Sequence, residues 1–328
     1  MPFIPNTDDD RREMLEKIGV SSFEGLIENI PQNIRLKGEL DLPPQLSEYE
    51  VYKLLASYAS KNKSAEEYVC FLGGGAYDHY VPAMVTSIID RPEFRTAYTP
   101  YQAEVSQGTL QAMYEFQSMI CTLTGMDVAN ASLYDGGSAM AEACLMANAQ
   151  NNRKEFLIAG SINPQYFKVV KTVSSGREFT FKTFIAEDGT ADLAALDAAI
   201  SDSTAAVIVQ HPNVYGNLED VHSIEKIAHS KKALFITAVE PISLGMLAPP
   251  GEYNADIVVG EGQSLGIPLN YGGPYLGLFA TKQQYVRKIP GRLSGVTVDA
   301  DGNRAFVLTL QTRRSEERRV GKECRSRW

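Results

Sequence analysis

Short loops rich in glycine are the first candidates for chemistry in this sequence. Asp135–Ser138 opens a helical pattern with two glycines, whose free N–H groups could face an anion. Asp135 also fits the N-cap of that helix, and this interpretation is favoured because its carboxylate would repel a phosphate. Gly260–Gly266 has the spacing of a dinucleotide fingerprint, but Pro268 stands where the required helix would run. We therefore do not expect a nicotinamide site.

Two other segments carry polar and aromatic side chains. His211–Asn213 follows a predicted strand, and a lone histidine in such a place is more often structural than functional. Tyr98–Gly108 mixes tyrosines with amide, hydroxyl and carboxylate groups, which suits the wall of a pocket for a small polar ligand. The alternative is a proline-bent loop that packs its tyrosines at a subunit interface. The two descriptions are compatible.

Several kinds of catalytic centre are disfavoured by the motifs that the sequence lacks. It contains no GxSxG elbow and no phosphate-binding P-loop. Because neither CxxC nor HExxH occurs, we predict no metal site. Cys70, Cys121 and Cys144 each lie in an apolar stretch, as expected of free thiols in a reducing cytoplasm.

Charge is distributed unevenly along the 328 residues. The net charge is −9, but residues 313–328 carry +4, which leaves −13 for residues 1–312. The negative charge of residues 1–312 argues against nucleic acid and against an anionic membrane as partners. A membrane-spanning helix needs about 18 consecutive apolar residues, and no run in the sequence comes near this length. No signal peptide is visible at the start. We therefore expect a cytoplasmic protein.

Alternating strands and helices dominate the sequence after a polar beginning. Residues 1–65 predict an N-terminal arm of short helices, and residues 66–312 predict one large domain. The predicted strands are 155–159, 179–185, 205–210, 233–239, 256–260 and 275–281, and the helical patterns are 108–124, 137–150, 191–200 and 219–230. This alternation is typical of an α/β protein whose mostly parallel sheet is covered on both faces.

Long segments of the sequence resemble one known family. They are Ala97–Gln111, Met119–Gly137 and Asn270–Gly277, and Phe3–Thr7 and Phe71–Pro82 agree with them. Together they resemble subunit 1 of the bacterial glycine dehydrogenase (decarboxylating). This subunit corresponds to the N-terminal half of the P-protein of the glycine cleavage system. The resemblance runs from the start of the chain to about Thr312.

The resemblance implies both a fold and an activity. The fold is that of the type I pyridoxal-phosphate enzymes, with a large, mostly parallel α/β domain of about seven strands and a small C-terminal domain. The activity is that of an oxidoreductase that decarboxylates glycine through pyridoxal phosphate and releases CO2. The remaining aminomethyl group passes to the lipoamide of H-protein. The implied partners are therefore glycine dehydrogenase subunit 2 and lipoylated H-protein.

Two residues that a pyridoxal-phosphate site needs are missing from this chain. Such a site requires a lysine that binds the cofactor and an acid against the pyridine nitrogen. By the resemblance, Gln263 and Ser264 stand at the position of the lysine, and Thr237 stands at that of the acid. We therefore expect the partner subunit to hold the cofactor. The chain has no catalytic residue of its own, and in isolation it is expected to be inactive.

The expected contribution of the chain is to complete the active-site cleft at the interface with subunit 2. The side chains expected to face this cleft are Tyr98, Tyr101, Gln102, Glu104, Gln107 and Asn270. One alternative is a non-enzymatic regulatory or binding paralogue of the same fold. A third interpretation is an autonomous transferase that uses a displaced lysine such as Lys282.

The basic tail stands apart from the family resemblance. Residues 313–328 occupy the place where the family's small C-terminal domain would begin, and they include the single tryptophan, Trp328. We interpret them as foreign sequence joined to a truncated reading frame, with a genuine basic tail as the alternative. The small domain is accordingly expected to be truncated.

Overall fold

A computed structural model describes residues 6–38, 40–65, 67–95, 100–270 and 272–310. The chain divides into two compact units, with the boundary between Lys63 and Ser64. No helix within the described residues is long and apolar enough to cross a membrane.

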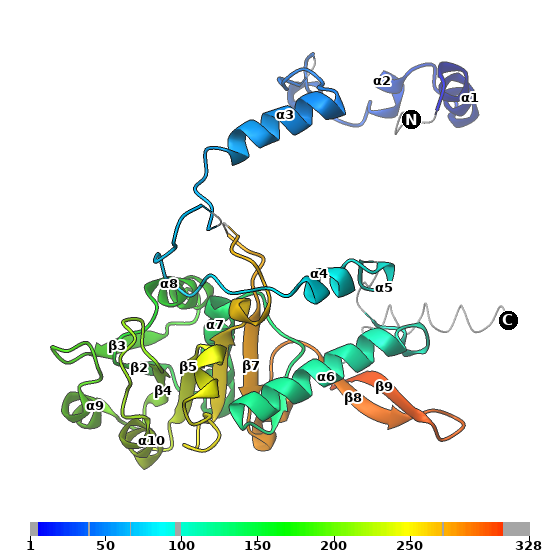
Figure 1. Cartoon of the computed structure of the whole chain (residues 1–328). Coiled ribbons are helices and arrows are strands. Elements are labelled where there is room, and N and C mark those ends of the chain that lie inside the picture. Colours follow the sequence, from blue (N-terminus) through cyan, green and yellow to red (C-terminus); the bar gives the residue numbers. More distant parts are fainter. Residues whose placement is uncertain (1–5, 39, 66, 96–99, 271, 311–328) are drawn as a thin grey trace. The chain divides into compact units, whose positions relative to one another are not determined.

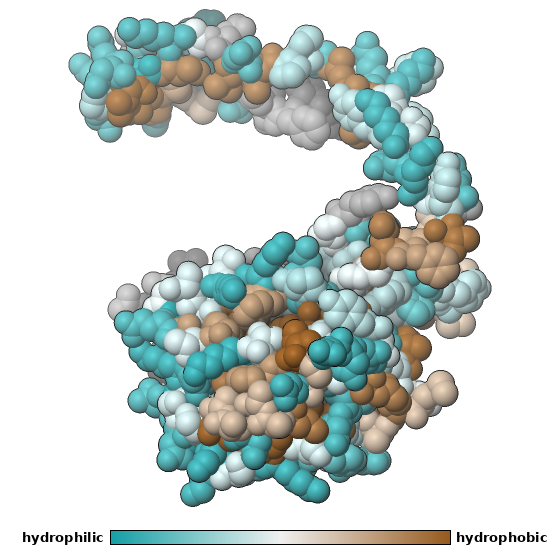
Figure 2. Space-filling view, turned by 90° about the vertical axis from the view of Figure 1, so that its left-hand side faces the viewer, coloured by the Kyte–Doolittle hydropathy of each residue, from teal (hydrophilic) through white to brown (hydrophobic). Residues whose placement is uncertain are grey.

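The first unit consists of short helices joined by extended segments. These are α1 (Asp8–Ile18), α2 (Phe23–Leu26), η1 (Gln32–Ile34) and α3 (Glu48–Ala59). The longest two, α1 and α3, each begin with a reciprocal capping box, formed by Thr7 with Asp10 and by Ser47 with Glu50. None of the residues in these helices is buried, and apolar side chains lie among hydrophilic ones on the surface (Figure 2). Local capping, and not burial in a core, therefore stabilises α1 and α3.

The second unit is built on a seven-stranded sheet in the order β1-β7-β6-β5-β4-β2-β3 (Figure 1). The strands are β1 (Val128–Ala129), β2 (Glu155–Ala159), β3 (Thr180–Phe184), β4 (Thr204–Gln210), β5 (Leu234–Val239), β6 (Ile257–Glu261) and β7 (Gly277–Thr281). Neighbouring strands are parallel except at β7, which runs antiparallel to β6 and to β1. The mostly parallel sheet expected from the sequence is confirmed.

Helices and short 3-10 turns precede the sheet, connect its strands and follow β7. They are α4 (Ala83–Ile89), α5 (Pro92–Arg95), η2 (Ala103–Val105), α6 (Gln107–Thr124), α7 (Gly136–Asn151), α8 (Pro164–Val173), α9 (Leu193–Ala199), α10 (Val221–Ser230), η3 (Pro241–Gly245), η4 (Gln263–Leu265) and η5 (Gln283–Lys288). A separate hairpin of β8 (Leu293–Val298) and β9 (Arg304–Thr309) follows η5. The hairpin packs against α6.

The core lies on both faces of the sheet because successive strand residues point in opposite directions. Val207 and Phe235 enter one buried cluster together with Ile224 of α10. Ile208 and Ile236 enter the other, which includes the inner face of α7. Nine residues of α7 are buried, so this helix is enclosed on most sides. Its position, and hence the position of its N-terminus, is fixed by that packing.

A buried carboxylate ties together the amino edge of the sheet, where β5 and β6 begin. Asp256 is 3% exposed and lies directly before β6. One of its oxygens, Oδ2, accepts hydrogen bonds from the Phe235 backbone N–H at 2.9 Å and from His229 Nε2 at 2.7 Å. The other, Oδ1, accepts one from Lys282 Nζ at 2.6 Å. Burial opposes ionisation of Asp256, but these donors outweigh it and hold the pKa of Asp256 below its usual value.

This network predicts a pH dependence of stability. The hydrogen bond to Asp256 raises the pKa of His229 above 6.5, although partial burial opposes the shift. Protonated His229 is therefore favoured in the folded state, and its stabilising contribution is complete below pH 6.5 and lost as the pH rises through the higher folded pKa. In urea unfolding at a series of pH values, His229→Gln should lie furthest below wild type in stability below pH 6.5. The difference should shrink at higher pH.

A control for this titration lies on the same helix. Ser230 is exposed at the end of α10 and carries no titrating group, so the stability of Ser230→Ala should run parallel to that of wild type at every pH. A constant gap between His229→Gln and wild type across the whole pH range would contradict the prediction.

Candidate functional site

The N-terminus of α7 lies next to the end of β6. Asp135 caps the helix, because its Oδ1 accepts a hydrogen bond from the Ser138 backbone N–H at 2.6 Å. This confirms the N-cap interpretation of the Asp135–Ser138 loop. A Cβ added to Gly136 would lie 2.8 Å from Tyr166 Oη and 3.2 Å from Glu261 Cβ. The absence of a side chain at Gly136 thus lets the helix start approach the sheet closely.

Glu261, the last residue of β6, places a carboxylate against this helix start. Its Oε2 accepts a hydrogen bond from the Gly136 N–H at 2.8 Å. Its Oε1 accepts from the Gln263 N–H at 3.1 Å and from the Leu276 N–H at 2.9 Å. Burial and the nearby charge of Asp135 raise the pKa of Glu261, while the three N–H donors oppose the rise. The sequence alone did not single out Glu261.

Gln263 and Ser264, predicted at the position of a missing lysine, are both buried, and both side chains are hydrogen-bonded. Gln263 Oε1 accepts from the Tyr77 N–H at 2.8 Å, and its Nε2 donates to Tyr77 O at 2.9 Å and to Ile267 O at 2.7 Å. Ser264 Oγ donates to Glu240 Oε1 at 2.7 Å. These side chains therefore hold segments of this chain in place.

Thr237 lies inside β5 and has no exposed surface. Its hydroxyl has no hydrogen-bond partner within the described part of the chain. An uncharged hydroxyl in this position cannot provide the carboxylate that a pyridine nitrogen requires.

The side chains predicted to face a cleft lie on two segments of the sequence, one leading into α6 and one leading into β7. Tyr98 lies outside the described residues. Tyr101, Gln102 and Glu104 are exposed on the segment that leads through η2 into α6. Asn270 is exposed in the connection between η4 and β7, where its carbonyl oxygen accepts a hydrogen bond from Tyr275 Oη at 2.8 Å. That these side chains face a shared cleft stays a prediction.

Gln107 connects the start of α6 to the β8–β9 hairpin. Its Nε2 donates to Ala103 O at 2.7 Å and to Phe306 O at 2.9 Å, and its Oε1 accepts from the Phe306 N–H at 2.9 Å. Both ends of this amide are therefore bonded to the backbone. The bonds hold the segment that carries Tyr101 and Glu104 against β9.

Two other candidates from the sequence occupy structural positions. His211 Nδ1 accepts a hydrogen bond from the Glu219 N–H at 3.1 Å, and burial lowers the pKa of His211. Lys282 follows β7 at the edge where Thr281 pairs with Ile257, which is the edge opposite Gln263. Because Lys282 Nζ is bonded to Asp256 there, it is held away from the position where a cofactor lysine is expected.

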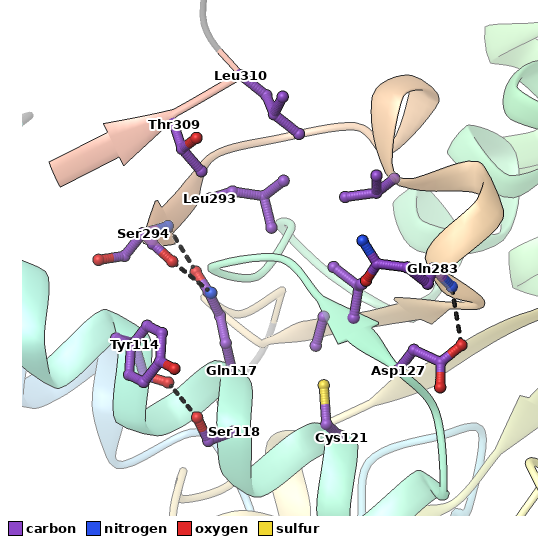
Figure 3. A pocket seen from close by; sticks show the side chains of 13 residues that line it. Tyr114, Gln117, Ser118, Cys121, Asp127, Gln283, Leu293, Ser294, Thr309 and Leu310 are labelled. Atoms are coloured by element: carbon purple, nitrogen blue, oxygen red, sulfur yellow. Dashed lines mark hydrogen bonds between the residues drawn. The ribbon is translucent and has the colours of Figure 1, made fainter. Parts of the chain in front are cut away.

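A cavity of about 390 Å³ lies between α6, β1, η5 and the β8–β9 hairpin (Figure 3). Gln117 spans one side of it through hydrogen bonds with the backbone of Ser294. Burial raises the pKa of Cys121, so this thiol is not an activated nucleophile. The carboxylate of Asp127 accepts a hydrogen bond from the Gln283 N–H at 2.8 Å. No cluster of potential metal ligands was found among the described residues.

The pyridoxal phosphate implied by the sequence resemblance does not fit these residues. Gln263 and Ser264 cannot bind it covalently, and Thr237 cannot pair with a protonated ring nitrogen. In addition, the N–H groups at the start of α7 already bond the carboxylates of Asp135 and Glu261. These residues at the carboxyl edge of the sheet therefore lack the groups that would bind the cofactor.

Nearly the whole chain is similar to known proteins. A family model described as the glycine cleavage system P-protein matches residues 1–322, and so reaches into the basic tail. The probable glycine dehydrogenase (decarboxylating) subunit 1 of Chloroherpeton thalassium is 59% identical over 319 residues, which are 97% of this chain and 72% of that protein. The chain is thus shorter than this relative.

Solved structures agree with the sequence comparison. A crystal structure of glycine decarboxylase (P-protein) of the glycine cleavage system, in inhibitor-bound form, is 43% identical with a TM-score of 0.86. The match covers 98% of this chain and 72% of that one. Sphingosine-1-phosphate lyase of Burkholderia pseudomallei has a TM-score of 0.58 at 12% identity, covering 84% of this chain and 67% of that one. This second likeness shows the fold alone.

The bonding of Gln263 predicts a specific loss of stability. Gln263 is 1% exposed, and Gln263→Leu removes the hydrogen-bond partner of the partly buried Tyr77 N–H and of the carbonyls of Tyr77 and Ile267, so we expect a loss of about 1–2 kcal/mol in urea unfolding. Hydrogen exchange at the Tyr77 amide should become faster. Gln165→Leu, at an exposed position in α8, should change stability by less than about 0.5 kcal/mol. Equal effects of the two changes would contradict the structural role of Gln263.

Proposed function

Because this chain belongs to the glycine cleavage system P-protein family, we propose that it works as subunit 1 of a heteromeric glycine dehydrogenase. In the complete enzyme, pyridoxal phosphate supplies the electron sink for the decarboxylation of glycine. CO2 is released, and the aminomethyl group passes to the lipoamide of H-protein. Subunit 2 holds the cofactor, and this chain completes the active site from the other side of the interface.

The observation that carries this division of labour is the bonding of Gln263 and Ser264. Both side chains are buried and occupied by Tyr77, Ile267 and Glu240. A lysine that formed a covalent bond to the cofactor would need a free amine at this place. The chain therefore contributes positioning and shape to the enzyme, and the covalent step belongs to its partner.

The contribution to the shared cleft comes from the segment before α6. Tyr101, Gln102 and Glu104 present a ring, an amide and a carboxylate to solvent, while Gln107 anchors the segment to β9. Exposed polar and aromatic groups on an anchored segment suit the rim of a small-molecule site. Glycine and the lipoyl arm of H-protein are the ligands that such a rim would meet in this enzyme.

Reconstitution tests the proposal directly. We expect glycine–bicarbonate exchange from a mixture of this chain, subunit 2 and H-protein, and none from this chain with H-protein alone. Borohydride reduction followed by peptide mapping should locate the cofactor on a lysine of subunit 2. If addition of this chain leaves the exchange rate of subunit 2 unchanged, the chain is a non-enzymatic paralogue. A cofactor fixed to a lysine of this chain would also overturn the proposal.

Single changes before α6 test the proposed rim. Tyr101→Ala and Glu104→Gln should each lower the exchange rate of the complex by about tenfold, a magnitude typical of an important interface residue. The matched control is Glu252→Gln, an exposed carboxylate before β6 at the amino edge of the sheet. It should leave the rate unchanged. Wild-type exchange from both rim variants at saturating subunit 2 would remove Tyr101 and Glu104 from the site.

A further inference from the structure

Three backbone N–H groups from separate parts of the chain converge on one side chain. Gly136 begins α7, Gln263 begins η4, and Leu276 lies directly before β7. All three donate hydrogen bonds of 2.8–3.1 Å to the carboxylate of Glu261. Convergent N–H groups at a helix start form the usual protein site for a phosphate or another anion.

Two carboxylates of the chain already lie at the start of α7. The positive end of the α7 dipole faces both Asp135, which caps the helix, and Glu261, which bonds its first residue. A phosphate brought to this place would meet two carboxylates and would find these N–H groups already bonded. The chain's own carboxylates therefore use both the positive end of the helix dipole and the N–H groups at the start of α7.

Close packing leaves little room for a larger anion. A Cβ on Gly136 would approach Tyr166 Oη to 2.8 Å, and one on Gly277 would approach the carbonyl oxygen of Asp135 to 2.4 Å. Glu261 itself is 7% exposed. The backbone thus closes around a side-chain carboxylate, which is smaller than a phosphate ester.

We propose that Glu261 is a built-in anion that takes the place of the cofactor's phosphate group in this subunit. Its carboxylate keeps the start of α7, η4 and the approach to β7 joined and excludes pyridoxal phosphate from this edge of the sheet. A lysine restored at position 263 is therefore not sufficient to restore cofactor binding. This inference deepens the proposed function and rests on its assignment of the cofactor to the partner subunit.

Removal of the carboxylate should create a dependence on added anions. In the full chain, Glu261→Ala frees three N–H donors, so inorganic phosphate and formate should raise its thermal midpoint in a saturable way. Wild type should show no such rise over chloride of equal ionic strength. Glu252→Ala, an exposed carboxylate at the opposite edge of the sheet, should behave like wild type. Recovery of folded Glu261→Ala only in phosphate or formate would also support the proposal.

The outcome that overturns the inference is an equal response to phosphate from wild type and Glu261→Ala. If Glu261→Ala is not recovered folded in any buffer, Glu261→Gln carries the test. Its amide keeps an oxygen for two of the donors but turns an N–H group toward the Gly136 N–H. Hydrogen exchange at Gly136 should then become at least tenfold faster than in wild type, and unchanged exchange would overturn the proposal.

A lysine variant separates this inference from the proposed function. Gln263→Lys with Glu261 intact should give no visible absorbance of bound pyridoxal phosphate. Binding of the cofactor by this variant would overturn the exclusion by Glu261. Because the exchange reaction is reconstituted with the wild-type chain, this result would leave the proposed function unaffected.

Discussion

Burial of the sheet on both faces is the constraint from which the polar architecture of the large unit follows. Strands β4 to β6 are almost wholly enclosed, so ionised groups are accommodated at the strand ends, where backbone N–H groups are also free. At the amino edge, Asp256 gathers His229 and Lys282. At the carboxyl edge, Glu261 gathers the loops around α7. Asp256 and Glu261 thus each join loops at one edge of the sheet.

The two carboxylates differ in what balances them. Asp256 accepts hydrogen bonds from His229, from Lys282 and from a backbone N–H, which explains why its pKa is lowered despite burial. Glu261 meets only backbone donors among the described residues and lies near a second carboxylate, and its pKa is raised. Glu261 is thus held by the backbone, and it forms no ion pair within the described part of the chain.

Apolar runs made most of the sheet predictable from sequence. Strands β2 and β4 to β7 were placed within one or two residues because each is a continuous buried run bounded by polar or glycine residues. Strand β1 has two residues, too few to leave a pattern. The partly exposed hairpin of β8 and β9 was not predicted either, although residues 305–308 form an apolar run. Helix α8 was missed as well, although Asn163 and Pro164 mark its start.

The site was less accessible to sequence reasoning because its key contacts join distant segments. Glu261 and Gly136 are 125 positions apart, and Gln263 and Tyr77 are 186 apart. Within Gly260–Gly266, Glu261 is an ordinary acid between glycines, and only the fold shows which N–H groups surround it. The resemblance to a family did identify Gln263 and Ser264, because the position of a missing lysine is defined by the motif around it.

Whichever subunit holds the cofactor, the backbone groups at the carboxyl edge of this sheet need hydrogen-bond partners. Free N–H groups at a helix start and loop carbonyls at a buried edge are costly if unpaired. In this chain, Glu261 meets the N–H groups, and the amide of Gln263 meets the backbone of Tyr77 and Ile267. The carboxyl edge therefore remains ordered without a ligand. An ordered edge is what a subunit needs if its role is to present a fixed surface to a catalytic partner.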